Sequence, residues 1–306
     1  MEPLFLNLPT EILLEITAYY HNTPLPYERY RRPTGDAILL GRFDMLRSLS
    51  QTCRTFRSIF LYLVWEHVEA LDIPSDTTGR HINLLKRRMT GILKTPSLPR
   101  FVRTVLVSLR LSAPNWNLIT VFARFLQATP NLSALHIVEI YDRHAGILAG
   151  RLAGQYFPSV QTLTIPSSLS RAVSSFPNLR TLICGDSFVS DYDALALLKE
   201  SSKHCPSLQS LANFTPSTSV IKGLLKHFPH VKELRFRHVA TSDILNLLGA
   251  LENLCSIEFP HRHRGERLEH IREAAERIFR TPVSVEYAPP EADVGDLVVK
   301  MRKVPL

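Results

Sequence analysis

Residues 130–137 read Pro-Asn-Leu-Ser-Ala-Leu-His-Ile, and the pattern of this stretch returns throughout the second half of the chain. A proline opens it, an apolar residue follows two positions later, and two more apolar residues come three and five positions after that. Further copies begin at Pro158, Pro177, Pro206 and Pro229, a copy without proline begins at Glu252, and residues 100–107 fit a first copy. Six or seven copies of one pattern predict a repeat protein.

Each copy has the features of a strand that follows a helix. Leu135 and Ile137 alternate, which places both on the same face of a strand. The opening proline disfavours helical backbone at the residue before it, so it ends the preceding helix. Between copies, apolar residues recur at helical spacing, for example at Ile244, Leu247 and Leu251. The sequence therefore predicts an α/β fold with parallel strands inside and helices outside.

A strand that alternates with a helix at this period resembles a leucine-rich repeat. The copies are 19 to 30 residues long and mostly lack that family's asparagine ladder, so we expect an irregular, open arc. Residues 297–299 either add a last strand or remain loose.

In such an arc, the strand positions between the core residues face the concave side. Late in the arc these positions are charged, which makes them a candidate target-binding patch: Glu233, Arg235, Arg237 and Glu258. The alternative is a solvated strand face on which Glu233 and Glu258 pair with the arginines, an arrangement worth little energy at a surface.

The first fifth of the chain carries a different signal. It contains Leu8-Pro9-Thr10-Glu11-Ile12, then Ile16, and later Leu46, Leu49, Cys53-Arg54, Phe56-Arg57, Ile59 and Trp65. Thr10 can cap a helix that has Glu11 in its first turn, and two further apolar faces predict a second and a third helix. Three short helices barely bury a core of their own, so their leftover apolar surface favours a partner.

This order of residues resembles the F-box, the short three-helix module that binds the Skp adaptor of a cullin ubiquitin ligase. In that family the Leu-Pro loop and the helix after it dock on the adaptor, and the later helices complete the interface. The resemblance implies adaptor binding through Leu8, Pro9, Ile12, Ile16, Leu49, Cys53 and Trp65. It also implies an F-box-like module over residues 1–71 with an insertion at 21–42, a linker and connecting helix over 72–98, and a leucine-rich-repeat-like domain over 99–306.

The composition is that of an ordinary globular protein, with 45% hydrophobic and 21% charged residues. No apolar run approaches the ~20 residues of a membrane helix, so no membrane partner is expected. The four cysteines show no paired spacing and lie in apolar surroundings, which indicates buried, reduced thiols in the cytoplasm or nucleus.

The formal net charge of +8 is spread thinly along the chain. Residues 1–98 hold 12 Lys or Arg against 10 Asp or Glu, and residues 99–306 hold 24 against 18. From this distribution we expect neither a dedicated basic face nor a nucleic-acid partner.

Motifs of catalysis are missing from the sequence: it has no glycine-rich phosphate loop, G-x-S-x-G, C-x-x-C or H-E-x-x-H. We therefore expect no enzyme, no catalytic or metal-binding residues and no cofactor. The predicted function is substrate recognition in a Skp-cullin-F-box ubiquitin ligase, with the adaptor and cullin scaffold on the module and an unidentified target protein on the arc. The alternative is a ligase-independent repeat scaffold that binds protein or nucleic acid.

Overall fold

The computed structural model describes residues 9–19, 45–71, 80–109, 116–186, 189–238, 241–261, 273, 276, 283–288 and 297–303. Its labelled helices are α1 (Thr10–Tyr19), α4 (Arg54–Glu66), α5 (Arg80–Lys94), α6 (Trp116–Ala128), α7 (Asp142–Leu152), α8 (Asp191–His204), α9 (Thr218–His227) and α10 (Ser242–Leu248), with the 3-10 helices η2 (Pro99–Phe101) and η3 (Ser167–Ser175); residues 45–52 are also helical. Its strands are β1 (His67–Ala70), β2 (Thr104–Leu109), β3 (Ala134–Ile140), β4 (Thr162–Ile165), β5 (Thr181–Cys184), β6 (Ser210–Phe214), β7 (Glu233–Phe236), β8 (Ser256–His261), β9 (Val283–Ala288) and β10 (Leu297–Lys303).

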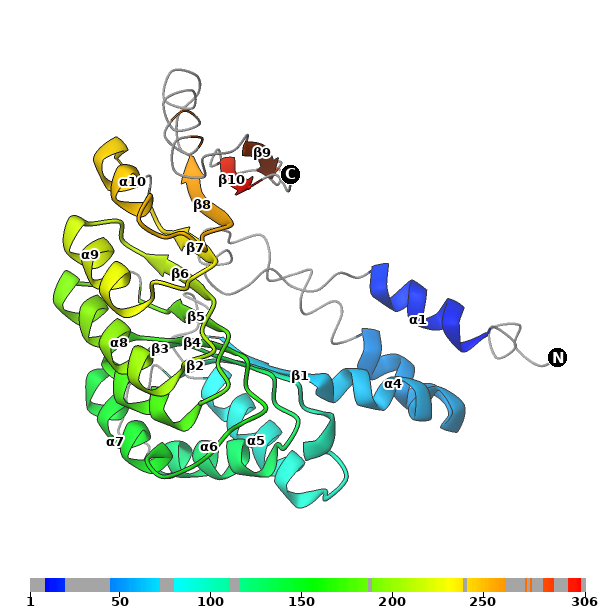
Figure 1. The fold of residues 1–306 in the computed structure, drawn as a ribbon. Coiled ribbons are helices and arrows are strands. Elements are labelled where there is room, and N and C mark those ends of the chain that lie inside the picture. The colour runs from blue at the N-terminus through cyan, green and yellow to red at the C-terminus, as the bar shows by residue number, and fades with distance from the viewer. Residues whose placement is uncertain are drawn as a thin grey trace.

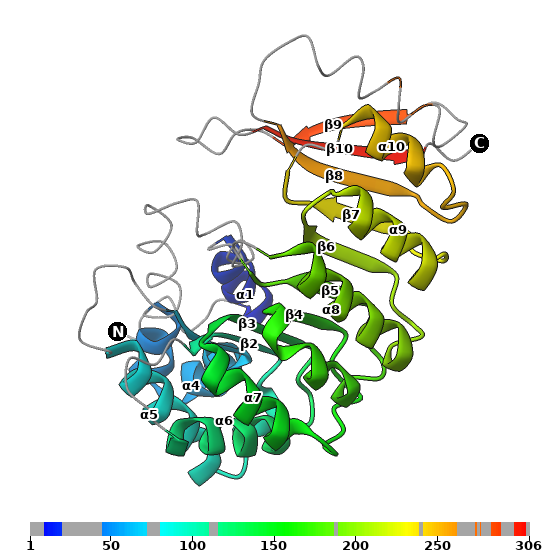
Figure 2. The same ribbon diagram turned by 90° about the vertical axis from the view of Figure 1, so that its left-hand side faces the viewer.

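The described strands form one sheet in the order β1-β2-β3-β4-β5-β6-β7-β8-β10-β9. Strands β1 to β8 are parallel and follow chain order, and β10 pairs antiparallel with both β8 and β9. Helices α5 to α10 lie along one side of this sheet, and the chain follows an arc from β1 to β8 (Figures 1 and 2). The predicted alternation of parallel strands and helices is thus confirmed.

Every repeat passes from helix to strand through the same turn. In the copy that begins at Pro130, the N–H of Leu132 donates to the carbonyl of Thr129 at 3.3 Å. Proline takes the second position of this four-residue turn, where its fixed φ suits the backbone. The same bond closes the turns at Pro158, Pro177, Pro206 and Pro229, and also the turn at Glu252, at 3.2 or 3.3 Å.

One backbone carbonyl per repeat ties each turn to the next. Arg180, for example, accepts from the N–H of Gln209 at 2.9 Å and from the N–H of Ser210 at 3.0 Å. The residues that accept two such bonds are Arg103, Ser133, Gln161, Arg180, Gln209 and Lys232. Main-chain groups make all of these bonds, and only at Ser133 does the side-chain hydroxyl add a further one, to the Arg103 carbonyl at 3.0 Å. The ladder therefore does not depend on the side chain at this position.

The core of the array lies between the sheet and its helices. Strand residues such as Leu135, Leu163 and Leu182 point into it and are buried completely or nearly so. In the shortest repeat, between β4 and β5, the 3-10 helix η3 covers the sheet in place of an α-helix. Its buried Leu169 and Val173 still reach the common core.

The array begins earlier than the sequence predicted. Residues 67–70, which the sequence assigned to the helical module, form β1 and pair with β2. Helix α5, expected as a connecting helix, covers the step from β1 to β2 like the other repeat helices, with Leu85 and Met89 fully buried. At the other end, β10 confirms the strand alternative for residues 297–299.

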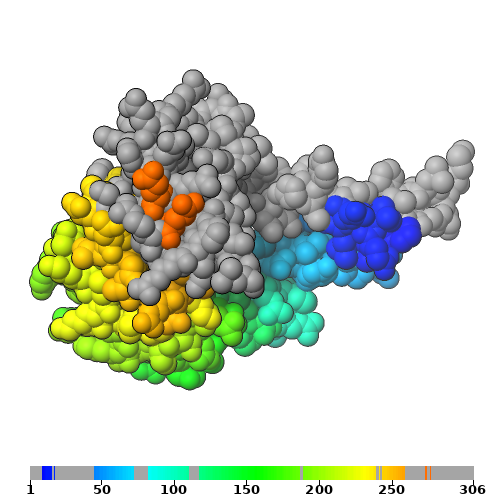
Figure 3. All heavy atoms as spheres, turned by 45° about the horizontal axis from the view of Figure 1, so that its top comes forward, coloured from blue at the N-terminus to red at the C-terminus, as the bar shows by residue number. Residues whose placement is uncertain are grey.

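The three predicted helices of the N-terminal module are present as α1, residues 45–52 and α4. They bury a small core of Leu13, Leu46, Phe56, Phe60 and Val64. This module extends away from the β1 end of the array (Figures 1 and 3). Among the described helices, none has the length and apolar character to cross a membrane.

Candidate functional site

The first helix of the module divides its apolar residues between the inside and the solvent. Leu13 is buried in the module core, whereas Ile12 is 42% exposed and Pro9 is exposed in front of the helix. The carbonyl of Pro9 accepts the N–H groups of Ile12 and Leu13 at 3.1 and 3.2 Å, so this proline begins the helix. Leu8 and the side chain of Ile16, both predicted to bind the adaptor, lie outside the described residues, as does the insertion at 21–42.

The later predicted residues of the module lie partly inside it. Leu49 and Cys53 pack partly buried against the module core, and the Sγ of Cys53 accepts from the N–H of Phe56 at 3.4 Å and so caps α4. Trp65 packs against both the module core and the core of the array. Its indole therefore joins the two parts, a role that its place in the motif did not predict.

The open face of the sheet, opposite the helices, carries one row of side chains in register across seven strands. We call it the central row: Leu106, His136, Thr164, Ile183, Ala212, Arg235 and Glu258. None of its apolar members belongs to the core between sheet and helices. The row is buried from Leu106 to Ala212, with exposed fractions of 7% or less. Solvent therefore reaches the row mainly at its β7 and β8 end.

Burial changes the chemistry of the one histidine in this row. The Nδ1 of His136 is hydrogen-bonded to the Oγ1 of Thr164 at 2.7 Å, and burial lowers the pKa of His136 to about 4. The imidazole is thus neutral near pH 7 and does not supply charge to the open face.

Two of the four predicted target-binding residues pair with each other. The guanidinium of Arg235 lies 2.8 Å from a carboxylate oxygen of Glu258, and both side chains are partly buried. Glu233 lies one row away, level with Ser256, and is exposed. The pairing that the sequence left open as an alternative is therefore present for Arg235 and Glu258.

Arg237, the last of the four predicted residues, links the carboxyl ends of two strands. Its guanidinium donates to the backbone carbonyl of Asp186, two repeats earlier in the array. A carboxylate oxygen of Asp186 in turn accepts the N–H of Ser167 at 2.7 Å. Asn213, at a positive φ of 66°, donates its side-chain amide to the carbonyl of Cys184 at 2.5 Å. We infer that Arg237 holds β5 and β7 together, which limits its availability to a target.

The cysteines differ in exposure more than the sequence predicted. Burial, aided by the nearby Asp186 carboxylate, raises the pKa of Cys184 to about 12, and burial raises that of Cys205 to about 12. Both are therefore unreactive thiols near neutral pH. Cys255 is exposed, contrary to the prediction of an apolar environment. The described residues contain no cluster of His, Cys, Asp or Glu that could hold a metal ion.

The structure separates charge between the two edges of the array. Because successive strands are parallel, the helices between them run back and end at the amino-terminal edge of the strands. The last helical turns and the turns that follow them span residues 91–103, 125–133, 149–161, 172–180, 201–209, 224–232 and 245–255. These segments hold eight exposed Lys or Arg, which we call the basic edge: Lys94, Arg100, Arg103, Arg151, Arg180, Lys203, Lys226 and Lys232. Their one acidic residue is Glu252.

The opposite edge, among the described residues, is acidic. Between strand ends and first helical turns lie five acidic residues, Asp142, Asp186, Asp191, Asp193 and Asp243, and three basic ones, Arg80, Arg143 and Arg237. The expectation that no basic face exists is therefore wrong. Cations spaced by the repeat period look dilute along the chain, but the array places them on one edge.

Comparisons with known proteins add no family to this description. No protein-family model matches the chain, and the search of curated proteins finds no match.

Proposed function

We propose that this chain is the substrate-recognition subunit of a Skp-cullin-F-box ubiquitin ligase. In this proposal the N-terminal helices are an F-box that binds the Skp adaptor, and the array is an irregular leucine-rich-repeat solenoid that binds a target protein. The chain performs no chemistry. It raises the effective concentration of a target lysine near a ubiquitin-conjugating enzyme held elsewhere in the complex.

The observation that carries this proposal is the exposed apolar surface of a module with a very small core. Ile12 is 42% exposed and Tyr62 is 36% exposed, on two different helices of the module. Leu49, Ile59 and Leu63 are only partly buried beside them. Among the described residues of the module, five buried side chains form its core, so coverage of this surface by a partner would add a large share of its stability.

The connection between module and array suits a receptor that must hold a target at a fixed place. Helix α4 ends at Glu66 and β1 begins at His67, with no linker between them. The carbonyl of Glu66 accepts the N–H of Arg103 at 2.9 Å, which continues the backbone ladder of the array. Trp65 packs against both cores at the same point. A rigid joint of this kind would transmit the orientation of the adaptor to the bound target.

A second candidate function is a repeat scaffold without any ligase, which binds protein or nucleic acid. The basic edge favours it, because a charged stripe binds an anionic partner with or without an adaptor. The two functions differ in whether the apolar face of α1 matters for assembly.

Affinity purification separates the two candidates. We expect the wild-type chain to recover a Skp adaptor and a cullin, and Ile12→Asp to lose both while it retains the targets. Leu84→Asp is the matched control, because Leu84 is also 42% exposed but lies on α5, outside the module. Recovery of the adaptor by Ile12→Asp at wild-type level would refute the F-box assignment. Absence of any adaptor from the wild-type purification would favour the scaffold.

A further inference from the structure

We propose that the basic edge binds an acidic segment of a partner protein. The choice of a protein partner rests on the proposed receptor function, whereas the surface itself is defined by the fold. The segments of this edge contain eight Lys or Arg and one Glu, so they carry most of the chain's formal net charge of +8. A stripe with one sign of charge attracts the opposite sign and speeds its encounter.

A favourable interaction with a helix dipole explains the position of only half of these cations. Lys94, Arg151, Lys203 and Lys226 lie in the last turns of their helices, where a positive charge complements the helix dipole. Of the other four, Arg100 lies in the 3-10 helix η2 with its guanidinium 4.9 Å from the centre of the Phe101 ring, whereas Arg103, Arg180 and Lys232 lie outside the helices. Their charge needs another explanation.

The ladder residues of the edge are available to a partner. Arg103, Arg180 and Lys232 occupy the same position in their repeats, directly before a strand, and their side chains are exposed. Their backbone carbonyls make the ladder bonds, so the side chains are not needed there. No hydrogen bond or ion pair joins these three side chains to another described residue. By contrast, Lys203 is paired with Glu200 at 2.6 Å.

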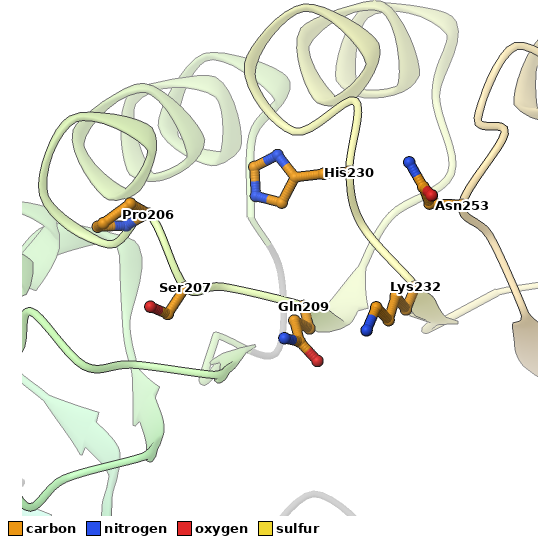
Figure 4. A pocket seen from close by; sticks show the side chains of 6 residues that line it. All are labelled: Pro206, Ser207, Gln209, His230, Lys232 and Asn253. Carbon is orange, nitrogen blue, oxygen red and sulfur yellow. The ribbon is translucent and has the colours of Figure 1, made fainter.

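A shallow hollow lies at the late end of the basic edge. Its volume is about 250 Å³, and it is lined by Pro206, Ser207, Gln209, His230, Lys232 and Asn253. Figure 4 shows Gln209 and Lys232 side by side, with the His230 ring and the Asn253 amide above them. The hydroxyl, amide, imidazole and ammonium groups can all donate to a carboxylate. The hollow is smaller than most sites for drug-sized ligands and suits one acidic side chain of a longer segment.

The spacing of the edge defines the length of the segment. Arg103 and Lys232 are separated by five strand-to-strand steps, which span about 24 Å at the usual strand spacing. An extended peptide covers this distance with roughly seven or eight residues. Single-stranded nucleic acid is less suited, because proteins that bind it stack successive bases on aromatic rings. Tyr156, which is 68% exposed, is the one exposed Phe, Tyr or Trp in the edge segments.

Fluorescence anisotropy with labelled octaglutamate tests this proposal. We expect the full chain to bind the peptide at low salt and to release it as salt is raised, because exposed charges are screened. The double variant Arg180→Glu with Lys232→Glu should bind at least about tenfold more weakly. The double variant Lys86→Glu with Arg87→Glu makes the same change in net charge on the exposed face of α5 and should bind within about twofold of wild type.

Three results would overturn the proposal: no binding of octaglutamate, equal losses in both double variants, or binding of labelled octathymidylate as tight as that of octaglutamate. The last would assign the edge to nucleic acid instead. Adaptor binding, measured on the same preparations, should be unchanged in both double variants. Failure of peptide binding with intact adaptor binding therefore rejects this inference alone, and the reverse result rejects the F-box assignment alone.

Discussion

Replacement of Gly185 by alanine should destabilise the array, because this glycine lies where three repeats meet. Its N–H donates to the carbonyl of Ile165 at 2.8 Å. A Cβ at this position would lie 3.1 Å from the carbonyl oxygen of Ile137 and 3.1 Å from backbone atoms of Ile165 and Pro166. Backbone atoms of paired strands cannot move aside as a flexible side chain can. Overpacking of this kind costs about 1–3 kcal/mol.

The same substitution at Gly150 is the matched control, and we expect it to change the free energy of unfolding in the opposite direction. Gly150 lies within α7, and a Cβ there would meet nothing within 4 Å. Alanine should stabilise this helix by about 0.5–1 kcal/mol. Urea unfolding followed by circular dichroism measures both changes, read as shifts of the midpoint at constant slope. Wild-type stability in Gly185→Ala, or an equal loss in Gly150→Ala, would refute the packing of β3, β4 and β5 described above.

Further predictions concern the module, the helix caps, the open face and the thiols. Phe60→Ala removes a fully buried ring of the module core and should cost about 3–5 kcal/mol of module stability, seen as faster proteolysis of the N-terminal helices. Ser190→Ala removes the hydroxyl that accepts the N–H of residue 193 at 3.1 Å and should cost about 1 kcal/mol in urea unfolding. Because the folded pKa of His136 is about 4, below the ordinary value of 6.5, the unfolded chain binds the extra proton. The contribution of the neutral His136 to the free energy of unfolding should therefore be fully present above about pH 6.5. About 2 kcal/mol of it should be lost as the pH falls to 5, and the His136→Gln variant should not show this loss. A thiol reagent at neutral pH should modify the exposed Cys255 first and reach Cys184, with its pKa of about 12, only on unfolding.

The sequence was sufficient to predict the array because each repeat carries its own local signals. The alternation of Leu135 with Ile137 places a strand, and the proline of each copy marks the turn before it. These signals act over a few residues, so the irregular repeat lengths did not obscure them. Strand β1 was missed because its four residues follow directly on α4 and have no proline turn in front of them.

The contacts between distant repeats could not be predicted in the same way. The bond from Arg237 to the carbonyl of Asp186 joins residues 51 positions apart, and its partner is a backbone group with no sequence signal. The pairing of Arg235 with Glu258 follows from the strand register and was one of the two alternatives drawn from the sequence. The basic edge was not predicted, although an alignment of the repeats could have revealed it. Alignment of the repeats places Arg103, Arg180 and Lys232 at one position, whereas a count of charge along the chain hides them.

We propose that the exposed apolar face of α1 binds a Skp adaptor, and titration calorimetry of the purified chain with a recombinant adaptor measures this binding. We expect saturable one-to-one binding with a negative heat-capacity change, since apolar surface is buried. We also expect a loss of at least about tenfold in affinity for Ile12→Asp, because a charge would be buried in that interface. Leu84→Asp should bind like wild type. Absence of binding by the wild-type chain, or equal affinity of Ile12→Asp and Leu84→Asp, would show that this face of α1 is not an adaptor-binding surface.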